Sequence, residues 1–590
     1  MKWFSSPVFT RLMLAATFAF ALLTTAPSIR AQSAPAAAPK VTSCDEYLVP
    51  RTEIRGKMIG QESCKMIETP VSLENKEYRR LDIGVSGTVD GWIPKKGRYD
   101  VYFGSNPEFT YPQGGNPEKL LYGVGQYEMD KGSAVVLLYP PEGQWNGKMF
   151  ITAHGRGRSF KSGTLRAWDK NLKPENPLSD VTKYEKAMLN LGFAVAKTYR
   201  SSPEDGGDTI VTLEDGTVFT DRNVTEQPRL IIGLAQVGAN ILKKRYGKLP
   251  TRTYWYGHSA GARAGRMVNY QPGLNIGPDG KHLIDGILAD DAGSGMWIPA
   301  VMKNGKNVLF TDEEPLPWFV TENKNPNIDY KKITGAKHKD WFVPQLDIHH
   351  LLYVNETSDD PPEWASTNFL ENKRINARVL RELGLGSKSR VYEVSGISHS
   401  GGETEPPAKL GTSPTIELSN LMEGFIMILD AWVDKGIAPP VDHADYAELG
   451  DADHDNVIEN GPLQLPDIAC PMGVHHIWAT PRGSQSSTGF TAFSGKGLEP
   501  VDKRGRVSED IFSFYNYVDM NNNTYRDHIE TMTEAWRRLG LIKPNETFSR
   551  AAFQSCVQKA TDKLAKDRFL SPRAAKWYVE QAAVVEFPSK

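Results

Sequence analysis

Short, continuous apolar runs alternate with longer segments of helical periodicity through the middle of this 590-residue chain. Two of the runs, 134–139 and 148–153, lack the apolar–polar alternation of a half-exposed strand. Continuous apolar strands are typical of a sheet that is covered on both faces. The pattern therefore predicts a buried β-sheet.

The same alternation continues to about residue 440. Further strands are expected at 193–199, 253–256, 283–289, 351–354 and 390–394, and helices at 183–191, 228–246, 262–268 and 374–383. Alternating strands and helices predict a mostly parallel sheet with right-handed crossovers. We therefore expect a doubly wound α/β domain over residues 120–440.

The flanking regions have other patterns. Strand-like runs such as 78–85 and 99–103 predict a β-rich N-terminal extension over residues 32–119. Residues 292–340 are rich in aromatic residues and proline and lack a clear period, as is typical of a cap insertion. Residues 441–590 are expected to form a loop-rich C-terminal appendage.

Composition narrows the class of protein. With 39% hydrophobic and 24% charged residues the chain is that of an ordinary globular protein. The formal net charge is −2 and no basic stripe occurs, so nothing indicates nucleic acid or an anionic membrane surface as a partner. The oligomeric state does not follow from the sequence.

The N-terminus has the pattern of a targeting segment. Lys2 and Arg11 precede the apolar run 12–23, and small residues around Ala31 offer a cleavage site. The apolar run is too short for a spanning helix, so residues 1–31 are predicted to be a secretory signal peptide. The mature protein would be secreted or periplasmic, without membrane attachment; an uncleaved anchor is the alternative.

An oxidising compartment changes the interpretation of the four cysteines. Their even number predicts two disulfides, and proximity in the sequence favours Cys44 with Cys64 and Cys470 with Cys556. Reduced, buried cysteines are the alternative.

One pentapeptide carries candidate chemistry. Gly257-His258-Ser259-Ala260-Gly261 is a G-x-S-x-G sequence between a predicted strand and a predicted helix. Such a turn is so sharp that the residues two before and two after the serine must lack a Cβ atom. Ser259 would be the nucleophile, and the N–H of Ala260, at the start of the helix, would donate to the developing oxyanion.

A second oxyanion donor is expected in the loop after strand 148–153. That strand leads into His154-Gly155-Arg156, and a glycine-containing turn lets the backbone approach a substrate carbonyl closely. We expect the donor to be the N–H of Gly155 or Arg156. An ordinary glycine-rich turn is the alternative.

Acyl transfer also needs a base that takes the serine proton. His399 lies in a loop of small residues after the last predicted strand, 390–394, and is the candidate base. His349 and His350 precede the predicted strand 351–354, which would place them at its wrong end. His258 is expected to line the site, because adjacent side chains point apart at the elbow.

A carboxylate must orient that base. Asp359 follows the predicted strand 351–354 and precedes His399, which suits the order serine, acid, histidine. The alternatives are Asp360 and Glu356 in the same loop, and Asp290 or Asp291 at the end of the preceding strand.

Residues from about 120 to 440 resemble the α/β-hydrolase superfamily through His154-Gly155, the G-H-S-A-G around Ser259 and the late His399. Segments 430–440 and 498–506 resemble a secreted bacterial group of α/β-hydrolase-domain proteins akin to tannase and feruloyl esterase. The resemblance implies hydrolysis of small-molecule or polymer-linked carboxylic esters by a triad of Ser259, Asp359 and His399.

The chain departs from the tannase pattern at one point. Tannase-type enzymes carry a disulfide between cysteines beside the nucleophile and the catalytic histidine. Here His258 and Ser398 stand at those places and no cysteine is nearby. The resemblance therefore does not extend to gallate or ferulate specificity.

A possible metal loop lies near the C-terminus. Residues 519–530 place oxygen side chains at positions 1, 3, 5, 9 and 12 of an EF-hand-like loop, before a predicted helix 530–539. The expected calcium ligands are Asp519, Asn521, Asn523, the Tyr525 carbonyl, Asp527 and Glu530. Thr524 replaces the usual glycine, and a polar turn capping a helix is the alternative. A weaker loop of this kind begins at Asp451.

Together these features predict a secreted serine hydrolase that cleaves carboxylic esters through an acyl-enzyme. It would need no cofactor for catalysis, and calcium would be structural. A peptidase or acyltransferase could use the same triad, because the triad does not define the acyl acceptor. A calcium-dependent binding protein without activity is the alternative from another class.

Overall fold

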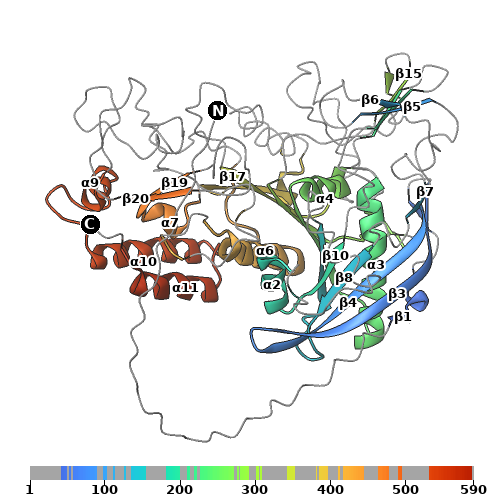
Figure 1. Cartoon of the computed structure of the whole chain (residues 1–590), viewed down its shortest axis with the longest axis horizontal. Helices are drawn as coiled ribbons and strands as arrows, with labels where there is room; N and C mark the ends of the chain where they lie inside the picture. The colour runs from blue at the N-terminus through green and yellow to red at the C-terminus, as the bar shows by residue number, and fades with distance from the viewer. Residues whose placement is uncertain are drawn as a thin grey trace, which may run out of the picture. The chain divides into compact units, whose positions relative to one another are not determined.

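The largest element of the computed structural model is a mixed β-sheet (Figure 1). Its strands are β1 (Val41–Ser43), β2 (Thr52–Ile54), β3 (Lys57–Leu73), β4 (Lys76–Val89), β7 (Gly125–Tyr127), β8 (Ala134–Tyr139), β9 (Lys148–Ala153), β10 (Ala194–Thr198), β13 (Arg252–His258), β14 (Gly286–Asp290), β17 (Gln345–Leu351) and β18 (Ser389–Ser395). Their order is β1-β3-β4-β8-β10-β9-β13-β14-β17-β18, with β2 paired to β3 and β7 to β4.

The structure describes residues 41–48, 52–54, 57–89, 98–102, 110–112, 125–127, 134–153, 178, 181–198, 209–212, 218–221, 226–270, 275–277, 279–291, 300–303, 306–307, 342–351, 381, 384–395, 397, 401, 409–411, 416–443, 463–476, 489–493 and 530–587. The predicted signal peptide lies outside these ranges. Within them, no helix has the length and apolarity needed to cross a bilayer.

The sheet has two halves of different strand direction. Neighbouring strands from β10 through β9, β13, β14 and β17 to β18 are parallel. The pairs from β1 to β8, and β8 with β10, are antiparallel. The predicted α/β sheet is therefore confirmed, and the carboxyl ends of five neighbouring parallel strands lie at one edge with the end of β10.

Both faces of this sheet are covered. Helices α2 (Lys183–Asn190) and α6 (Ser419–Lys435) pack on one face, and α3 (Glu226–Tyr246) and α4 (Ala260–Tyr270) pack on the other. Successive strand side chains point to opposite faces. Tyr254 and Tyr256 accordingly belong to one hydrophobic cluster and Trp255 to the other. This is why the strands appear as continuous apolar runs in the sequence.

Polar contacts at the amino ends of the parallel strands fix helix α6. The Lys148 ammonium lies 2.7 Å from a carboxylate oxygen of Asp430 and 3.0 Å from one of Asp434. The Tyr254 hydroxyl donates to Asp430 at 2.6 Å. Burial, together with that carboxylate, raises the pKa of Tyr254 far above its usual value, so the phenol remains a donor.

The C-terminal region is helical where it is described, with α9 (Met532–Arg538), α10 (Arg550–Lys566) and α11 (Pro572–Val584). The rings of Tyr392, Phe425 and Phe569 pack together at centroid distances of 5.3 to 5.7 Å. These rings join β18, α6 and the segment after α10 in one hydrophobic cluster. The sequence analysis did not anticipate α10 and α11.

Both disulfides are those that the sequence predicted. Cys44 is bonded to Cys64, and Cys470 to Cys556. The second bond joins the end of α7 (Pro466–Ala469) to α10.

A separate antiparallel sheet combines three distant parts of the sequence. Its strands are β5 (Arg98–Tyr102), β6 (Thr110–Pro112), β11 (Thr209–Thr212), β12 (Val218–Asp221), β15 (Ala300–Lys303) and β16 (Lys306–Asn307). Their order is β16-β15-β12-β11-β5-β6. β15 and β16, from the predicted cap insertion, thus share one sheet with β5 and β6 of the N-terminal extension, with β12 and β11 between them. A two-stranded sheet of β19 (Gly473–His476) and β20 (Gly489–Ala492) follows α7.

One predicted strand was misplaced. The strand expected to start at Leu351 starts at Gln345, so His349 and His350 lie inside β17, near its carboxyl end. The prediction that these histidines precede the strand is therefore wrong. Of the predicted helix 374–383, the described residues include only Arg381, which is helical.

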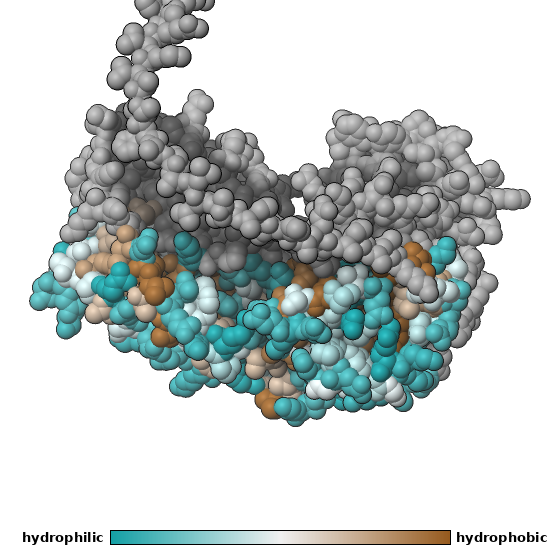
Figure 2. Space-filling model, turned by 60° about the horizontal axis from the view of Figure 1, so that its bottom comes forward, coloured by the Kyte–Doolittle hydropathy of each residue, from teal (hydrophilic) through white to brown (hydrophobic). Residues whose placement is uncertain are grey.

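The described surface shows no single large apolar area in the view of Figure 2. Hydrophilic residues predominate among the coloured residues, and the hydrophobic ones form small separate groups. The exposed large hydrophobic side chains of the described residues are Val41, Leu249, Met427, Ile437, Val441, Val579 and Val584. Scattered apolar side chains are normal on a protein surface and do not indicate a docking face.

Helix α6 packs closely against the segment after α10 at Gly424. A Cβ atom on Gly424 would lie 1.9 Å from the Phe569 carbonyl oxygen. Alanine favours helix by about 1 kcal/mol over glycine, but this clash with the backbone should reverse the effect. We expect Gly424→Ala to lower the free energy of unfolding by about 2 kcal/mol or more in urea denaturation.

Gly238→Ala in α3 is the matched control. Its added Cβ would meet only side chains, the nearest being Leu137 Cδ1 at 3.3 Å. We expect this variant to remain within about 1 kcal/mol of wild type. Equal losses in both variants would contradict the packing of α6 against Phe569.

Candidate active site

Ser259 occupies a strained turn between β13 and α4. Its φ angle is +55°, in the left-handed region that residues other than glycine seldom adopt. A Cβ atom on Gly257 would lie 2.2 Å from the Gly261 carbonyl oxygen, so no larger residue fits there. The strand, the strained serine and the close approach of the two glycines are the geometry of a nucleophile elbow.

Two hydrogen bonds hold this turn. The indole N–H of Trp255 donates to the Gly261 carbonyl at 3.1 Å, and the N–H of Ser259 donates to the Asp290 carbonyl at 2.9 Å. A left-handed residue of this kind costs about 1–2 kcal/mol. The surrounding contacts must offset that cost, and Asp290 provides more of them through its side chain.

The Asp290 carboxylate is buried and accepts three hydrogen bonds. One oxygen lies 2.9 Å from His350 Nε2. The other lies 3.0 Å from His258 Nδ1 and accepts from the Tyr256 hydroxyl at 3.1 Å. Asp290 and His350 are fully buried, and His258 is nearly so. This cluster joins the carboxyl ends of β13, β14 and β17 directly beside Ser259.

Charge determines the protonation pattern of the cluster. Burial by itself raises the pKa of Asp290, but the charge of His350 and the hydrogen bonds from His350 and His258 outweigh it. The pKa of Asp290 is therefore held well below its usual range. Because an ionised carboxylate only accepts, His258 Nδ1 and His350 Nε2 must both carry hydrogen.

Asp291, the next residue, is also strained. Its φ angle is +42°, and its carboxylate accepts the backbone N–H of His350 at 3.2 Å. Its other oxygen lies 3.6 Å from His350 Nδ1. The His350 ring is therefore flanked by two carboxylates. Strained residues concentrate at functional sites, and here two of them end neighbouring strands.

The loop that contains His399 is described on both sides of it. Ile397 is fully buried, and the Gly401 carbonyl accepts from the Tyr184 hydroxyl at 2.9 Å. A Cβ atom on Gly401 would lie 3.2 Å from His350 Cε1. Gly401 thus lies beside His350 of the Asp290 cluster.

The strand before the predicted oxyanion loop is fixed by a buried polar group. The Thr152 hydroxyl donates to one oxygen of Glu185 at 2.6 Å, and the Lys197 ammonium donates to the other at 3.1 Å. All three side chains are buried near the carboxyl ends of β9 and β10. Their contacts hold the carboxyl end of β9, at the same edge of the sheet as Ser259.

The described residues contain only part of the predicted site. Ser259 and Ala260 lie at the elbow. The other predicted residues Gly155, Arg156, Asp359 and His399, and the alternative acids Glu356 and Asp360, lie outside the described residues. Asp290, one of the two alternative acids at the end of β14, has both carboxylate oxygens hydrogen-bonded to His258, His350 and Tyr256.

Sequence analysis missed the partnership of Asp290 with His258 and His350. The signal that could have suggested it is that His258, Asp290 and His350 each lie at the carboxyl end of a largely apolar strand. Their pairing depends on β13, β14 and β17 being neighbours, which a linear pattern does not reveal.

The predicted calcium loop is represented by Glu530 alone among the described residues. Its two carboxylate oxygens accept from Arg538 Nε and Nη2, each at 2.8 Å. Thr531 caps α9, with Glu534 completing a capping box. Calcium binding by both oxygens of Glu530 would therefore have to displace Arg538. Within the described ranges, no group of three or more His, Cys, Asp or Glu residues is arranged to hold a metal ion.

No protein-family model and no curated protein sequence matches this chain. Similar solved structures include an esterase from Aspergillus oryzae, with 13% identity and a TM-score of 0.28, covering 66% of this chain and 89% of that one. A glucuronoyl esterase from Teredinibacter turnerae has 10% identity and a TM-score of 0.27, covering 66% and 80%. A truncated carbohydrate esterase from gut microbiota has 14% identity and a TM-score of 0.24, covering 45% and 83%. Values this low carry no inference about function.

Proposed function

We propose that this protein is a serine hydrolase that cleaves carboxylic esters through an acyl-enzyme intermediate. The observation that carries the proposal is the strained backbone of Ser259, at the carboxyl end of β13 and the start of α4. That conformation exposes a serine hydroxyl beside the N–H groups of a helix start. Glu74 and Asn75 show that a positive φ also occurs in an ordinary turn, so the support comes from its place between a strand and a helix, with Gly257 packed against Gly261.

In the proposed mechanism Ser259 Oγ attacks the ester carbonyl while His399 removes its proton. The negative oxygen of the tetrahedral intermediate accepts hydrogen bonds from the N–H of Ala260 and from that of Gly155 or Arg156. His399 returns the proton to the leaving alcohol. Water then attacks the acyl-enzyme by the same route, releasing the acid and freeing Ser259.

Neighbouring described residues support these assignments. Gly401, two residues after His399, lies against His350, which is bonded to Asp290 beside Ser259. β17 ends at Leu351, so the loop carrying Asp359 leaves the sheet at the same edge. Asp359 is proposed as the acid that orients His399.

Asp290 has a positioning role in this mechanism. Its carbonyl binds the N–H of Ser259, and its carboxylate binds the imidazole of His258, the residue before the nucleophile. One residue thus restrains both sides of the strained peptide. It contacts no reacting atom in the proposed steps.

The choice of an ester over an amide rests on the tannase-like sequence features described above. The peptidase or acyltransferase alternative would use the same residues. We further propose that the signal peptide directs the protein out of the cytoplasm and that calcium orders the loop at 519–530. Both proposals rest on sequence, and the two disulfides are compatible with export.

A fluorophosphonate probe should label the mature protein at Ser259. Ser259→Ala should abolish both labelling and hydrolysis of short-chain aryl esters, because no other group can form the acyl-enzyme. The melting temperature should change little, and mass spectrometry locates the label. Labelling at another residue, or undiminished turnover by the variant, would refute the proposed nucleophile.

Asp290→Asn should lower kcat at least about ten-fold and change KM by less than about three-fold. Asparagine keeps the shape but replaces one acceptor by a donor, so it cannot accept from both imidazoles. The rate of fluorophosphonate labelling should fall in parallel, since it reports Ser259 reactivity without substrate.

Asp347→Asn is the control for general loss of a buried carboxylate. Asp347 lies on β17 and accepts from Arg266 at 2.6 Å and from Gln345 at 2.7 Å, without contact to the elbow. This variant should be destabilised but label at the wild-type rate. If both variants slow labelling equally, Asp290 has no special positioning role.

Stability should depend on pH through the same carboxylate. Because the pKa of Asp290 is lower in the folded state, its contribution is complete above its unfolded pKa of about 3.9 and declines below it. The difference in melting temperature between wild type and Asp290→Asn should therefore shrink as pH falls from about 6 toward 3. A difference that is constant across this range would contradict the ionised state.

Chelation tests the calcium proposal. EDTA should lower the melting temperature of wild type, and added calcium should restore it, by mass action on the folded state. Asp519→Asn should abolish this response. Glu530→Gln is unsuitable here, because it also removes the partner of Arg538. A melting temperature indifferent to EDTA would leave 519–530 as a capped turn without metal.

A further inference from the structure

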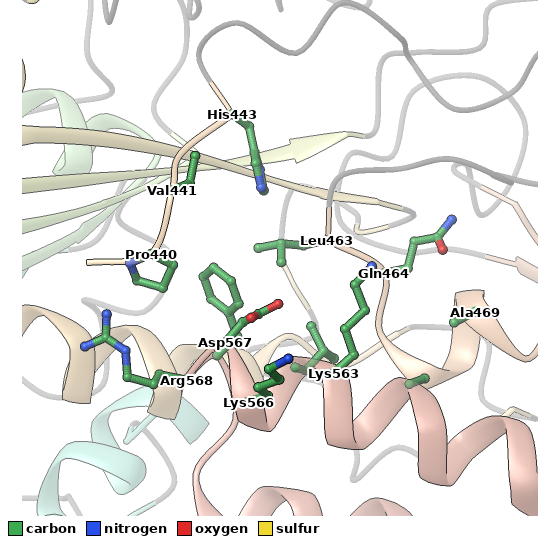
Figure 3. Close-up of a pocket in the computed structure, with 13 residues that line it drawn as sticks. Pro440, Val441, His443, Leu463, Gln464, Ala469, Lys563, Lys566, Asp567 and Arg568 are labelled. Atoms are coloured by element: carbon green, nitrogen blue, oxygen red, sulfur yellow. The ribbon is translucent and has the colours of Figure 1, made fainter. Parts of the chain in front are cut away.

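A pocket of about 430 Å³ lies beside the edge strand β18 (Figure 3). It is formed by the segment after α6, residues 440–443, by residues 463–469 up to the end of α7, and by the last turns of α10 with the residues that follow, 560–569. Neither Ser259 nor Asp290 lines it. Its volume is in the range of small-molecule sites, about 300–1,000 Å³.

The walls of this pocket are held in place. The backbone N–H groups of His443 and Leu463 donate to carbonyls of β18 at 2.8 and 3.2 Å. The disulfide between Cys470 and Cys556 joins α7 to α10 next to the pocket. A site whose walls are already fixed loses little conformational entropy when a ligand binds.

The inner surface of the pocket is apolar. Leu463, Leu564 and Phe569 line it and are each no more than 5% exposed. Pro440 and Ala469 add further apolar surface. This surface can cover the hydrocarbon part of a ligand.

The rim is cationic. Lys563, Lys566 and Arg568 line the pocket, with Asp567 as the single carboxylate among its lining residues. Arg568 donates to the Ala438 carbonyl at 2.5 Å, which fixes its guanidinium at the rim. Across the described residues, none of these three cations has a carboxylate within salt-bridge distance. The described lining of the pocket therefore carries three cationic side chains against one carboxylate.

His443 also lines the pocket. Its Nδ1 accepts the backbone N–H of Glu393 at 3.1 Å, so the hydrogen of the neutral ring is on Nε2. Figure 3 shows the ring extending from its backbone toward the pocket. The pocket therefore combines an apolar surface with several hydrogen-bond donors and an excess of positive charge.

We propose that this pocket binds a small organic carboxylate whose hydrocarbon body lies on the apolar surface and whose charged group meets Lys563, Lys566 and Arg568. Lysines in the last turn of a helix also offset its dipole without any ligand. That explanation accounts for Lys563 and Lys566 but not for the fixed apolar pocket that they border. The proposal is independent of Ser259 and of ester hydrolysis.

Isothermal titration of the full mature protein with benzoate tests the proposal. Benzamide, a neutral analogue of the same shape, should bind at least about ten-fold more weakly, because it lacks the charge. Inorganic phosphate should also bind more weakly, since it has no apolar body. Higher ionic strength should weaken benzoate binding, because the cations are exposed.

Paired variants locate the site. Lys563→Gln with Lys566→Gln should weaken benzoate binding at least about ten-fold. Lys559→Gln with Lys576→Gln removes the same charge from exposed positions of α10 and α11 outside the pocket and should leave binding within about two-fold of wild type. Circular dichroism should show that both double variants are folded.

Three results would overturn the proposal: no benzoate binding by wild type up to about 10 mM, equal binding of benzoate and benzamide, or equal binding by the two double variants. Ser259→Ala protein should bind benzoate as wild type does. Because binding is measured directly, failure of the proposed hydrolase activity would leave this result unaffected.

Discussion

The contacts of Asp290 with His258 and Ser259 are the constraint on which the candidate site depends. Ser259 has a left-handed backbone that costs free energy, and Asp290 restrains the preceding peptide by accepting the Ser259 N–H at its carbonyl and binding the His258 imidazole with its carboxylate. A buried carboxylate is itself unfavourable unless it is fully hydrogen-bonded. Here two imidazoles and the Tyr256 hydroxyl supply those hydrogen bonds, and they also fix the orientation of the carboxylate.

The parallel half of the sheet makes this arrangement possible. Parallel strands bring their carboxyl ends, and therefore the loops that follow them, to one edge. The loops expected to supply the oxyanion donor, acid and base leave β9, β17 and β18 at that edge. The amino ends are used differently: there Lys148, Tyr254 and Asp430 fasten α6 to the sheet. One edge of the sheet thus carries the proposed chemistry, and the other carries structural contacts.

The C-terminal helices extend the core rather than stand apart from it where they are described. Phe569 packs against Tyr392 and Phe425, and the Cys470–Cys556 disulfide fixes α7 to α10. The same packing leaves a lined pocket with a cationic rim beside β18. Phe569 therefore belongs both to the core and to the lining of the candidate ligand site. A substitution in this region can change stability as well as binding, so each variant needs a control with the same change of charge.

The sequence by itself determined the features that depend on neighbours along the chain. Apolar runs located β8 and β9, glycine spacing located the elbow, and proximity gave both disulfide pairings. It misplaced β17, because the buried polar residues His349 and His350 interrupt the apolar pattern that marks a strand. Its proposed acid, base and second oxyanion donor lie outside the described residues.

Only the tertiary structure decided the partners of Asp290. His258 and His350 lie 32 and 60 residues away in sequence, and they meet Asp290 because strand order places β14 between β13 and β17. Burial of a histidine or carboxylate is favourable only when such partners are in reach. A linear pattern contains the residues but not their distances, so it could locate the turn at Ser259 but not the cluster that holds this turn.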